Sequence, residues 1–233
     1  EVSALPGNFW IRLLYIHPDH FPFEILDLCA NDRRILPYFD LPFQHASAGL
    51  LSRMNRRGNR ETYLTLVDTI RGALPDAVIR STFLLGFLGE NGKAFRELRG
   101  FIEEARVDWG GFFTYSREEG TPAYRFRGGL GDVLSRGPAR RRMEELREIQ
   151  ERITRERMDR FVSHTMDVLI EEEIPGEGVC LGRGYIHAPE VDGAVVVKGA
   201  FAPGTVVSCV ITARNGIDLE ASPTDIFPDR GGI

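Results

Sequence analysis

Apolar positions gather in four short, continuous runs in the first half of the chain. The runs are Phe9–Ile16, Tyr38–Phe43, Val78–Phe87 and Trp109–Tyr115. Apolar residues follow one another in these runs instead of alternating with polar ones. This pattern predicts strands that are buried on both faces.

Stretches with helical spacing separate these runs. In Ala94–Ala105, apolar side chains recur at three- and four-residue intervals, which is the period of an amphipathic helix. The other predicted helices are Phe23–Ala30, Ala46–Met54 and Tyr63–Leu74. Alternating strands and helices predict βαβ units and a parallel sheet, an α/β fold. Four units indicate either part of a larger barrel or a small open sheet, and the pattern alone leaves both open.

A different texture begins at Arg136. Arg136–Arg160 holds nine Arg and six acidic residues around an apolar stripe, which predicts one amphipathic helix. This helix is either a solvated connector or a contact surface for an acidic or phosphate-bearing partner.

Short strand-like runs with turn signals between them follow from Phe161. The runs are Thr165–Glu171, Gly178–Gly182, Ala194–Lys198 and Val206–Thr212. They predict a small antiparallel β-barrel of the oligonucleotide-binding type. The expected organisation is therefore a parallel barrel part over 1–135, a connecting helix over 136–160, a β-barrel over 161–222 and a disordered tail over 223–233.

Charge narrows the partners of the predicted β-barrel. Phe161–Ser222 carries nine acidic and three basic residues, a formal charge of −6, whereas the whole chain carries −5. A barrel that follows a phosphate backbone should be basic. The acidic barrel therefore favours a basic protein as partner and makes tRNA an unlikely one.

The composition and the cysteine count indicate the cellular compartment in which the protein is expected. No run of about twenty apolar residues suggests a membrane span, and the first residues show no export signal. The three cysteines, Cys29, Cys180 and Cys209, are odd in number and far apart. They give no disulfide framework and are expected to be buried apolar residues in a cytoplasmic protein.

Polar residues recur where each predicted parallel strand ends. They include Tyr15, His17, Gln44, His45, Glu90 and Tyr115. Gly86 and Gly89 lie among them and let the backbone come close to a ligand. Because the carboxyl ends of parallel strands share one edge, these residues predict a pocket that binds and orients a ligand. Glu90 either caps the next helix or accepts hydrogen bonds from a ligand, and single histidines are more often structural than catalytic.

Four segments carry a family resemblance. Trp10–Asp19, Tyr38–Met54, Ile79–Glu90 and Phe112–Tyr124 closely resemble the radical-SAM methylthiotransferases, in order, from about residue 8 to about 221. The resemblance implies a partial radical-SAM (TIM-like) parallel barrel, the later four of six strands, followed by a TRAM domain. It also implies S-adenosylmethionine as cofactor and two [4Fe–4S] clusters whose ligands are absent from this chain, so that the chain alone is expected to be inactive.

The resemblance also implies site residues. Matched by position, those expected to contact S-adenosylmethionine are Gln44, His45, Arg80, Thr82, Gly86, Glu90, Phe113 and Tyr115. Two departures from the family pattern bear on whether the full-length protein to which this chain would belong is active. Leu88 replaces a proline in the family's Gly-Phe-Pro-Gly-Glu-Thr motif, although Asn91 can still cap the following helix, and the stretch 128–137 is unusually rich in glycine.

The Gln44-His45-Ala46-Ser47 run matches the branch of the family that acts on a ribosomal protein. This resemblance implies methylthiolation of an aspartate β-carbon in small-subunit ribosomal protein twelve. The alternatives are a tRNA-modifying relative with the same chemistry, and a non-catalytic module that grips a basic ribosomal protein.

Overall fold

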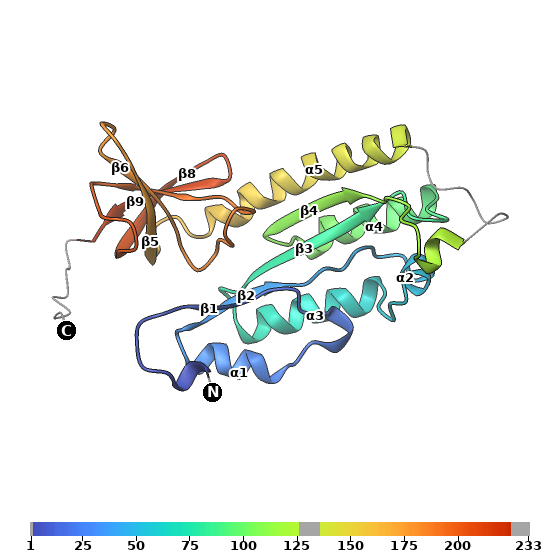
Figure 1. Ribbon diagram of the computed structural model, residues 1–233, viewed down its shortest axis with the longest axis horizontal. Coiled ribbons are helices and arrows are strands. Elements are labelled where there is room, and N and C mark those ends of the chain that lie inside the picture. Colours follow the sequence, from blue (N-terminus) through green and yellow to red (C-terminus); the bar gives the residue numbers. More distant parts are fainter. Residues whose placement is uncertain (1, 126–135, 225–233) are drawn as a thin grey trace. The chain divides into compact units, whose positions relative to one another are not determined.

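The computed structural model describes residues 2–125 and 136–224 of the chain (Figure 1). These residues fold as two compact units, Glu1–Ile153 and Thr154–Ile233. Each unit has its own sheet, so each is described by itself.

A four-stranded parallel sheet forms the centre of the first unit, in the order β1-β2-β3-β4. The strands are β1 (Ile11–Leu13), β2 (Ile35–Asp40), β3 (Val78–Leu85) and β4 (Trp109–Thr114). All four predicted strands are therefore present. The first is only three residues long because its pairing with β2 shifts register between Ile11 and Leu13.

Helices follow the strands as expected. They are α1 (Glu24–Asn31), α2 (Ala48–Arg53), α3 (Arg60–Ala73), α4 (Gly92–Ala105) and α5 (Arg136–Asp159). Short 3-10 turns occur at η1 (Val2–Ala4), η2 (Pro18–His20) and η3 (Pro122–Arg125). The Asn91 side chain accepts hydrogen bonds from the backbone N–H groups of Lys93 and Ala94 and so starts α4, which confirms the predicted cap.

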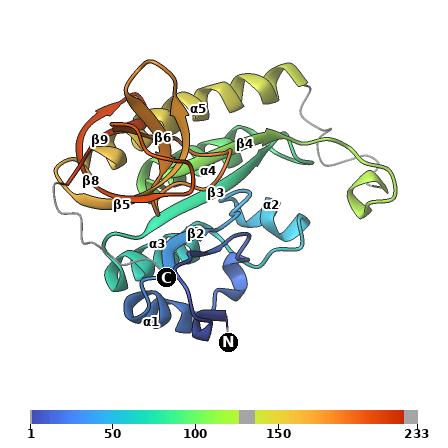
Figure 2. The ribbon, with the colours of Figure 1, turned by 60° about the vertical axis from the view of Figure 1, so that its left-hand side comes forward.

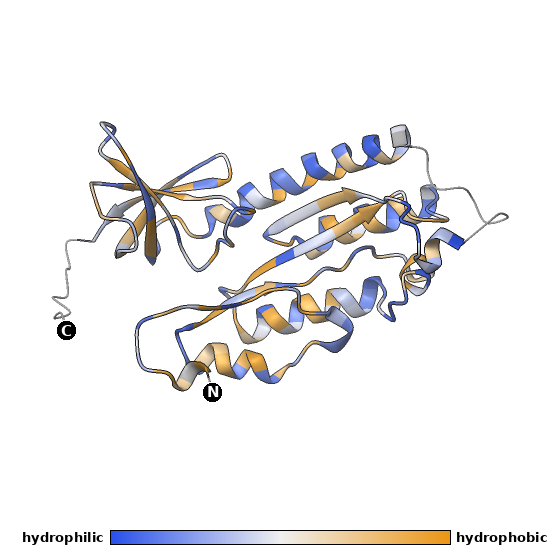
Figure 3. Ribbon diagram, in the orientation of Figure 1, coloured by the Kyte–Doolittle hydropathy of each residue, from blue (hydrophilic) through white to orange (hydrophobic). Residues whose placement is uncertain are grey.

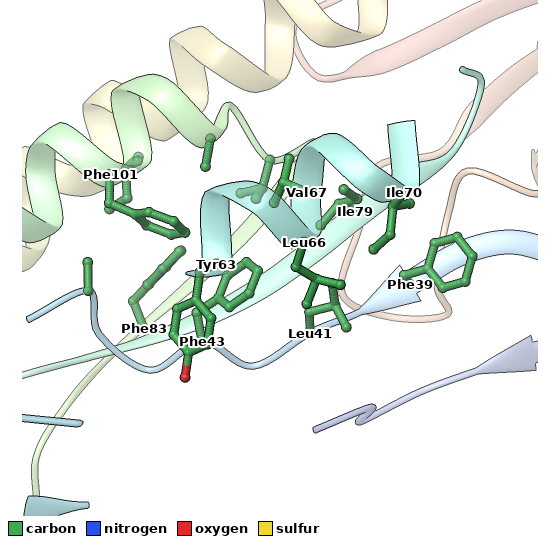
Figure 4. Close-up of a cluster of buried hydrophobic side chains, with 14 of the residues drawn as sticks. Phe39, Leu41, Phe43, Tyr63, Leu66, Val67, Ile70, Ile79, Phe83 and Phe101 are labelled. Carbon is green, nitrogen blue, oxygen red and sulfur yellow. The ribbon is translucent and has the colours of Figure 1, made fainter. Parts of the chain in front are cut away.

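One helix-covered face of the sheet holds the core (Figure 4). Alternate residues of β3, such as Ile79 and Phe83, enter this core, where the Phe83 ring meets that of Phe101 of α4. The residues between them, Arg80 and Thr82, remain half-buried on the other face. The expectation of strands buried on both faces holds at the start of β3 and β4, where Val78 and Trp109 are buried on that other face. It is wrong further along these strands, where Arg80 and Thr82 are half-buried and Phe113 is exposed.

The amphipathic α5 belongs to the first unit as far as Ile153. Polar and apolar residues alternate along it in Figure 3. Leu146 and Ile153 join the core of the sheet. The Gln150 amide donates to the Val107 carbonyl over 2.8 Å, and its side-chain carbons lie so close to Gly110 that a Cβ there would be 2.7 Å away. A glycine in β4 thus allows close packing of the helix.

A closed five-stranded barrel, shown in Figure 2, forms the second unit. Its strands are β5 (Thr165–Ile174), β6 (Val179–Arg183), β7 (Val195–Lys198), β8 (Val206–Asn215) and β9 (Asp218–Pro223). Four pairings are antiparallel, but β7 and β9 pair in parallel, so the prediction of a fully antiparallel barrel is wrong at this pair. The sequence pattern also missed β9, which closes the barrel.

The predicted tail begins later than expected, since Pro223 ends β9 and the Thr224 N–H donates to the Ser208 carbonyl over 2.9 Å. The rest of that tail, 225–233, lies outside the described residues, as do residues 128–135 of the glycine-rich stretch 128–137. Within the described part of the chain, no helix is both long enough and apolar enough to span a membrane.

Candidate functional site

The face of the sheet opposite the core brings three predicted site residues together. A Cβ built on Gly111 of β4 would lie 3.5 Å from the Phe113 ring, 3.6 Å from Nη2 of Arg80 and 3.7 Å from Oγ1 of Thr82. Phe113 is exposed, at 57% of its maximal area. The missing side chain at Gly111 therefore leaves open a space bordered by a guanidinium, a hydroxyl and an aromatic ring.

Arg80 is held on this face by a residue that the sequence pattern did not single out. Asp40, the last residue of β2, is 2% exposed and accepts a hydrogen bond from Nη1 of Arg80 over 3.2 Å. Its other oxygen accepts from the Tyr15 N–H over 3.3 Å. One buried carboxylate thus connects the ends of β1 and β2 with β3. An acidic residue inside an apolar run was the signal that could have revealed it.

Gln44 pairs with β3 through its backbone. Its N–H donates to the Thr82 carbonyl and its own carbonyl accepts from the Leu84 N–H, both over 2.8 Å. Its φ of 66° lies in the left-handed region, as does the φ of 59° at Tyr15. Such conformations cost free energy in non-glycine residues and gather at functional sites. Both lie where neighbouring parallel strands end.

His45, the residue after Gln44, is fully buried. Its Nδ1 accepts hydrogen bonds from the N–H groups of Ala46 and Ser47, each over 2.9 Å, and so fixes the entry to α2. Burial, together with the positive charge of Arg142, lowers the pKa of His45 to about 3. The imidazole is therefore neutral. Its Nε2 is buried without a hydrogen-bond partner among the described residues, and the contact of His45 with S-adenosylmethionine stays a prediction.

The loop after β3 contains Gly86 and Glu90. Gly86 and Gly89 have φ values of 79° and 82°, which explains the need for glycine at both positions. Glu90 is 5% exposed, and its two oxygens accept from the Gly86 N–H and from Nη1 of Arg142. Both carboxylate oxygens that would contact a ligand in the predicted role of Glu90 thus already accept hydrogen bonds from within the chain.

Tyr115 ends the row of strand tips. Its N–H donates to the Leu85 carbonyl over 2.7 Å, and its ring meets that of Phe87 edge-on at 5.0 Å between centroids. Its hydroxyl oxygen is buried and has no hydrogen-bond partner among the described residues. Tyr115 therefore packs against the small apolar cluster that contains Phe87.

The cysteines do not form a metal site. All three are free and buried, as expected, and burial raises the pKa of Cys29 and of Cys209 to about 11. No group of three or more potential metal-ligating side chains occurs in the segments that the structure describes. The described residues therefore do not fit an iron–sulfur cluster, which needs clustered thiolates.

Comparisons with known proteins agree with this arrangement. A model of the TRAM domain matches residues 162–223. The ribosomal protein uS12 methylthiotransferase RimO of Treponema denticola is 44% identical over 95% of this chain and 51% of its own length. RimO of Aquifex aeolicus is 40% identical over 96% of this chain and 52% of its own length. The chain spans about half the length of the curated relatives it matches.

The fold has a counterpart among solved structures. Coproporphyrinogen III oxidase (HemN) from Escherichia coli, described as a radical SAM enzyme, matches with a TM-score of 0.52 at 13% identity, over 87% of this chain and 46% of that one. This likeness shows the fold alone: a partial radical-SAM parallel barrel followed by a small TRAM β-barrel. Taken together with the sequence identity along nearly its whole length, it shows that the chain belongs to the RimO group of the methylthiotransferase family.

Proposed function

We propose that this chain is the cofactor-holding and substrate-recognising part of a methylthiotransferase that modifies an aspartate of ribosomal protein uS12. The observation that carries the proposal is the 36–44% identity to RimO proteins over about 95% of the chain. The open face around Gly111 supplies a place for the cofactor on that scaffold.

The residues on this face fit S-adenosylmethionine, which supplies the reactive chemistry when bound. A guanidinium and a hydroxyl, from Arg80 and Thr82, suit the carboxylate and ribose of such a ligand, and the exposed Phe113 ring suits its adenine. Gln44, whose backbone pairs with β3 beside Thr82, is proposed to contribute its side-chain amide. The proposed role of these residues is to bind and orient the ligand. Because the described residues do not fit an iron–sulfur cluster, we propose that the chain alone binds without reacting.

The charge of the barrel supports a protein substrate. Glu172, Glu173 and Glu177 lie exposed on β5 and the turn after it, in a barrel with a formal charge of −6. Negative potential attracts a basic ribosomal protein and repels tRNA. The tRNA-modifying alternative is therefore disfavoured.

The test uses the complete protein that contains this chain, reconstituted anaerobically with iron and sulfide. It is incubated with S-adenosylmethionine, a reductant and either uS12 or tRNA, and both products are analysed by mass spectrometry. We expect one methylthio group on an aspartate of uS12 and none on tRNA. Modification of tRNA alone would reject the proposed substrate. The same reconstitution of the isolated chain should give no reduced-cluster EPR signal.

A further inference from the structure

The loop between β3 and α4 is held by a buried ion pair that reaches α5. Oε1 of Glu90 accepts from Nη1 of Arg142 over 2.6 Å, and Oε2 accepts from the Gly86 N–H over 2.5 Å. The side chains of Glu90 and Arg142 are 0% and 19% exposed. The Arg142 guanidinium also lies over the ring of Phe95, 5.0 Å from its centroid.

Stability alone does not explain this pair. Desolvating two charges costs about as much free energy as their attraction returns, so apolar side chains of similar volume often serve as well. A carboxylate with both oxygens engaged, however, fixes its donors in one geometry. The pair therefore determines where the Gly86 amide lies.

Gly86 occupies a position from which its placement affects the candidate site. It directly follows Leu85, whose carbonyl accepts a hydrogen bond from the Tyr115 N–H. One residue earlier, the Leu84 N–H donates to the Gln44 carbonyl. Phe87, one residue further, packs against the Tyr115 ring. A shift of the Gly86 amide would therefore move the contacts at the ends of both β2 and β4.

We propose that Arg142 is a positioning residue for the ligand face of the sheet. Through Glu90 it holds the Gly86 amide, so that α5 becomes part of the binding apparatus without touching the ligand. The inference rests on the proposed function, because it takes S-adenosylmethionine as the ligand of this face. It also gives Glu90 an indirect role instead of the direct contact expected from the sequence.

The test measures S-adenosylmethionine binding to this chain by calorimetry, together with the thermal midpoint of each variant. Arg142→Met should weaken binding by roughly tenfold or more, the worth of one charge-assisted hydrogen bond. Arg142→Lys should recover most of the affinity. The matched control is Arg99→Met, which removes the exposed 3.1 Å ion pair between Arg99 of α4 and Glu145 of α5. Its affinity should equal that of the wild type.

A double variant separates positioning from stability. Glu90→Leu with Arg142→Met replaces both charges by apolar groups, and it should regain the thermal midpoint lost by Arg142→Met but not the affinity. Wild-type affinity in the double variant would overturn the proposal.

Absence of binding by the wild-type chain would count against the proposed function of this face. The role of Arg142 in holding the Gly86 amide through Glu90 is then tested by a second measurement. Amide hydrogen exchange at Gly86 and Tyr115 should then be faster in Arg142→Met than in Arg99→Met. Equal exchange in the two variants would overturn the proposal that Arg142 positions the Gly86 amide.

Discussion

Two adjacent glycines on β4 face opposite sides of the sheet and have opposite requirements. A Cβ on Gly110 would meet Gln150 at 2.7 Å, whereas one on Gly111 would make only ordinary contacts of 3.5 Å or more. Gly110→Ala should therefore lower the free energy of unfolding by about 1–3 kcal/mol, because α5 must move. Gly111→Ala should change it by less than about 0.5 kcal/mol.

Urea unfolding followed by tryptophan fluorescence measures this difference, because Trp10 and Trp109, the two tryptophans of the chain, both lie in the first unit. Gly111→Val should in addition abolish S-adenosylmethionine binding by filling the open space. Equal destabilisation by the two alanine variants would contradict the opposite orientation of these glycines.

His45 should make the stability of the first unit depend on pH. The unfolded chain takes up a proton on this imidazole below about pH 6.5, whereas the folded chain does so only near the lowered pKa of about 3. The stabilisation is therefore complete above pH 6.5 and is lost as pH falls, by up to about 1.4 kcal/mol per pH unit. Urea titrations between pH 7 and pH 4 should show a shallower slope for His45→Asn. The exposed His20→Asn is the control, and an unchanged slope in His45→Asn would refute the assignment.

Two polar residues that are adjacent in sequence can occupy different environments in the structure, and the sequence pattern does not show which of them is buried. Gln44 is half-buried and pairs with β3 through its backbone, whereas the side chain of His45 enters the interior. The left-handed φ at Gln44 breaks the simple alternation of a strand, so polarity alone could not separate the two residues. Arg80 and Thr82 were predicted as site residues by resemblance, and their position around Gly111 required the register of β3 against β4.

At the scale of elements, strands and helices with strong periodicity were predictable, and elements fixed by pairing were not. The apolar run Val78–Phe87 predicted β3 to within two residues of its end. In contrast, β9 (Asp218–Pro223) mixes acidic, apolar and proline residues and acquires its strand conformation from β7 and β8 on its two sides. The exposure of Phe113 on the second face of the sheet was also unpredictable, because the sequence does not distinguish an exposed apolar residue from a buried one.

The β5–β6 ladder depends on a glycine. A Cβ on Gly182 would lie 2.6 Å from the Leu169 carbonyl oxygen and 2.7 Å from a methyl of Val168. Gly182→Ala should therefore destabilise the barrel by about 2–3 kcal/mol. Since the barrel contains no tryptophan, hydrogen exchange of its amides is the measurement.

The control for this change is Gly176→Ala in the turn after β5. Gly176 has a φ of 82° but no atom within 4 Å of its Cβ position, so the cost should be about 1–2 kcal/mol, from the left-handed backbone alone. A larger loss in Gly176→Ala than in Gly182→Ala would show that crowding at Gly182 is relieved.

Over the whole molecule, only the barrel carries a net negative charge. Phe161–Ser222 has a formal charge of −6, whereas the remaining residues hold 26 basic and 25 acidic side chains, a charge of +1. The proposed binding of uS12 should therefore weaken with rising salt and depend on the barrel. The variant Glu172→Gln, Glu173→Gln, Glu177→Gln should slow association by about tenfold at low salt, measured by surface plasmon resonance.

The matched control removes three exposed acids from the first unit, as Glu24→Gln, Glu61→Gln and Asp68→Asn. It has the same net charge as the barrel variant, so a purely global effect would slow both equally. Equal slowing would reject the barrel as the docking surface.

The parallel pairing of β7 with β9 sets an order of events during folding. The hairpin of β8 and β9 turns at Gly216 and needs only local contacts, so it can form early. The parallel ladder between Val195–Lys198 and Asp218–Pro223 must close a loop that contains all of β8. Loop closure costs entropy before any new contact repays it. We therefore expect the amides of the β8–β9 hairpin to become protected first in a pulse-labelling experiment, and those between β7 and β9 last.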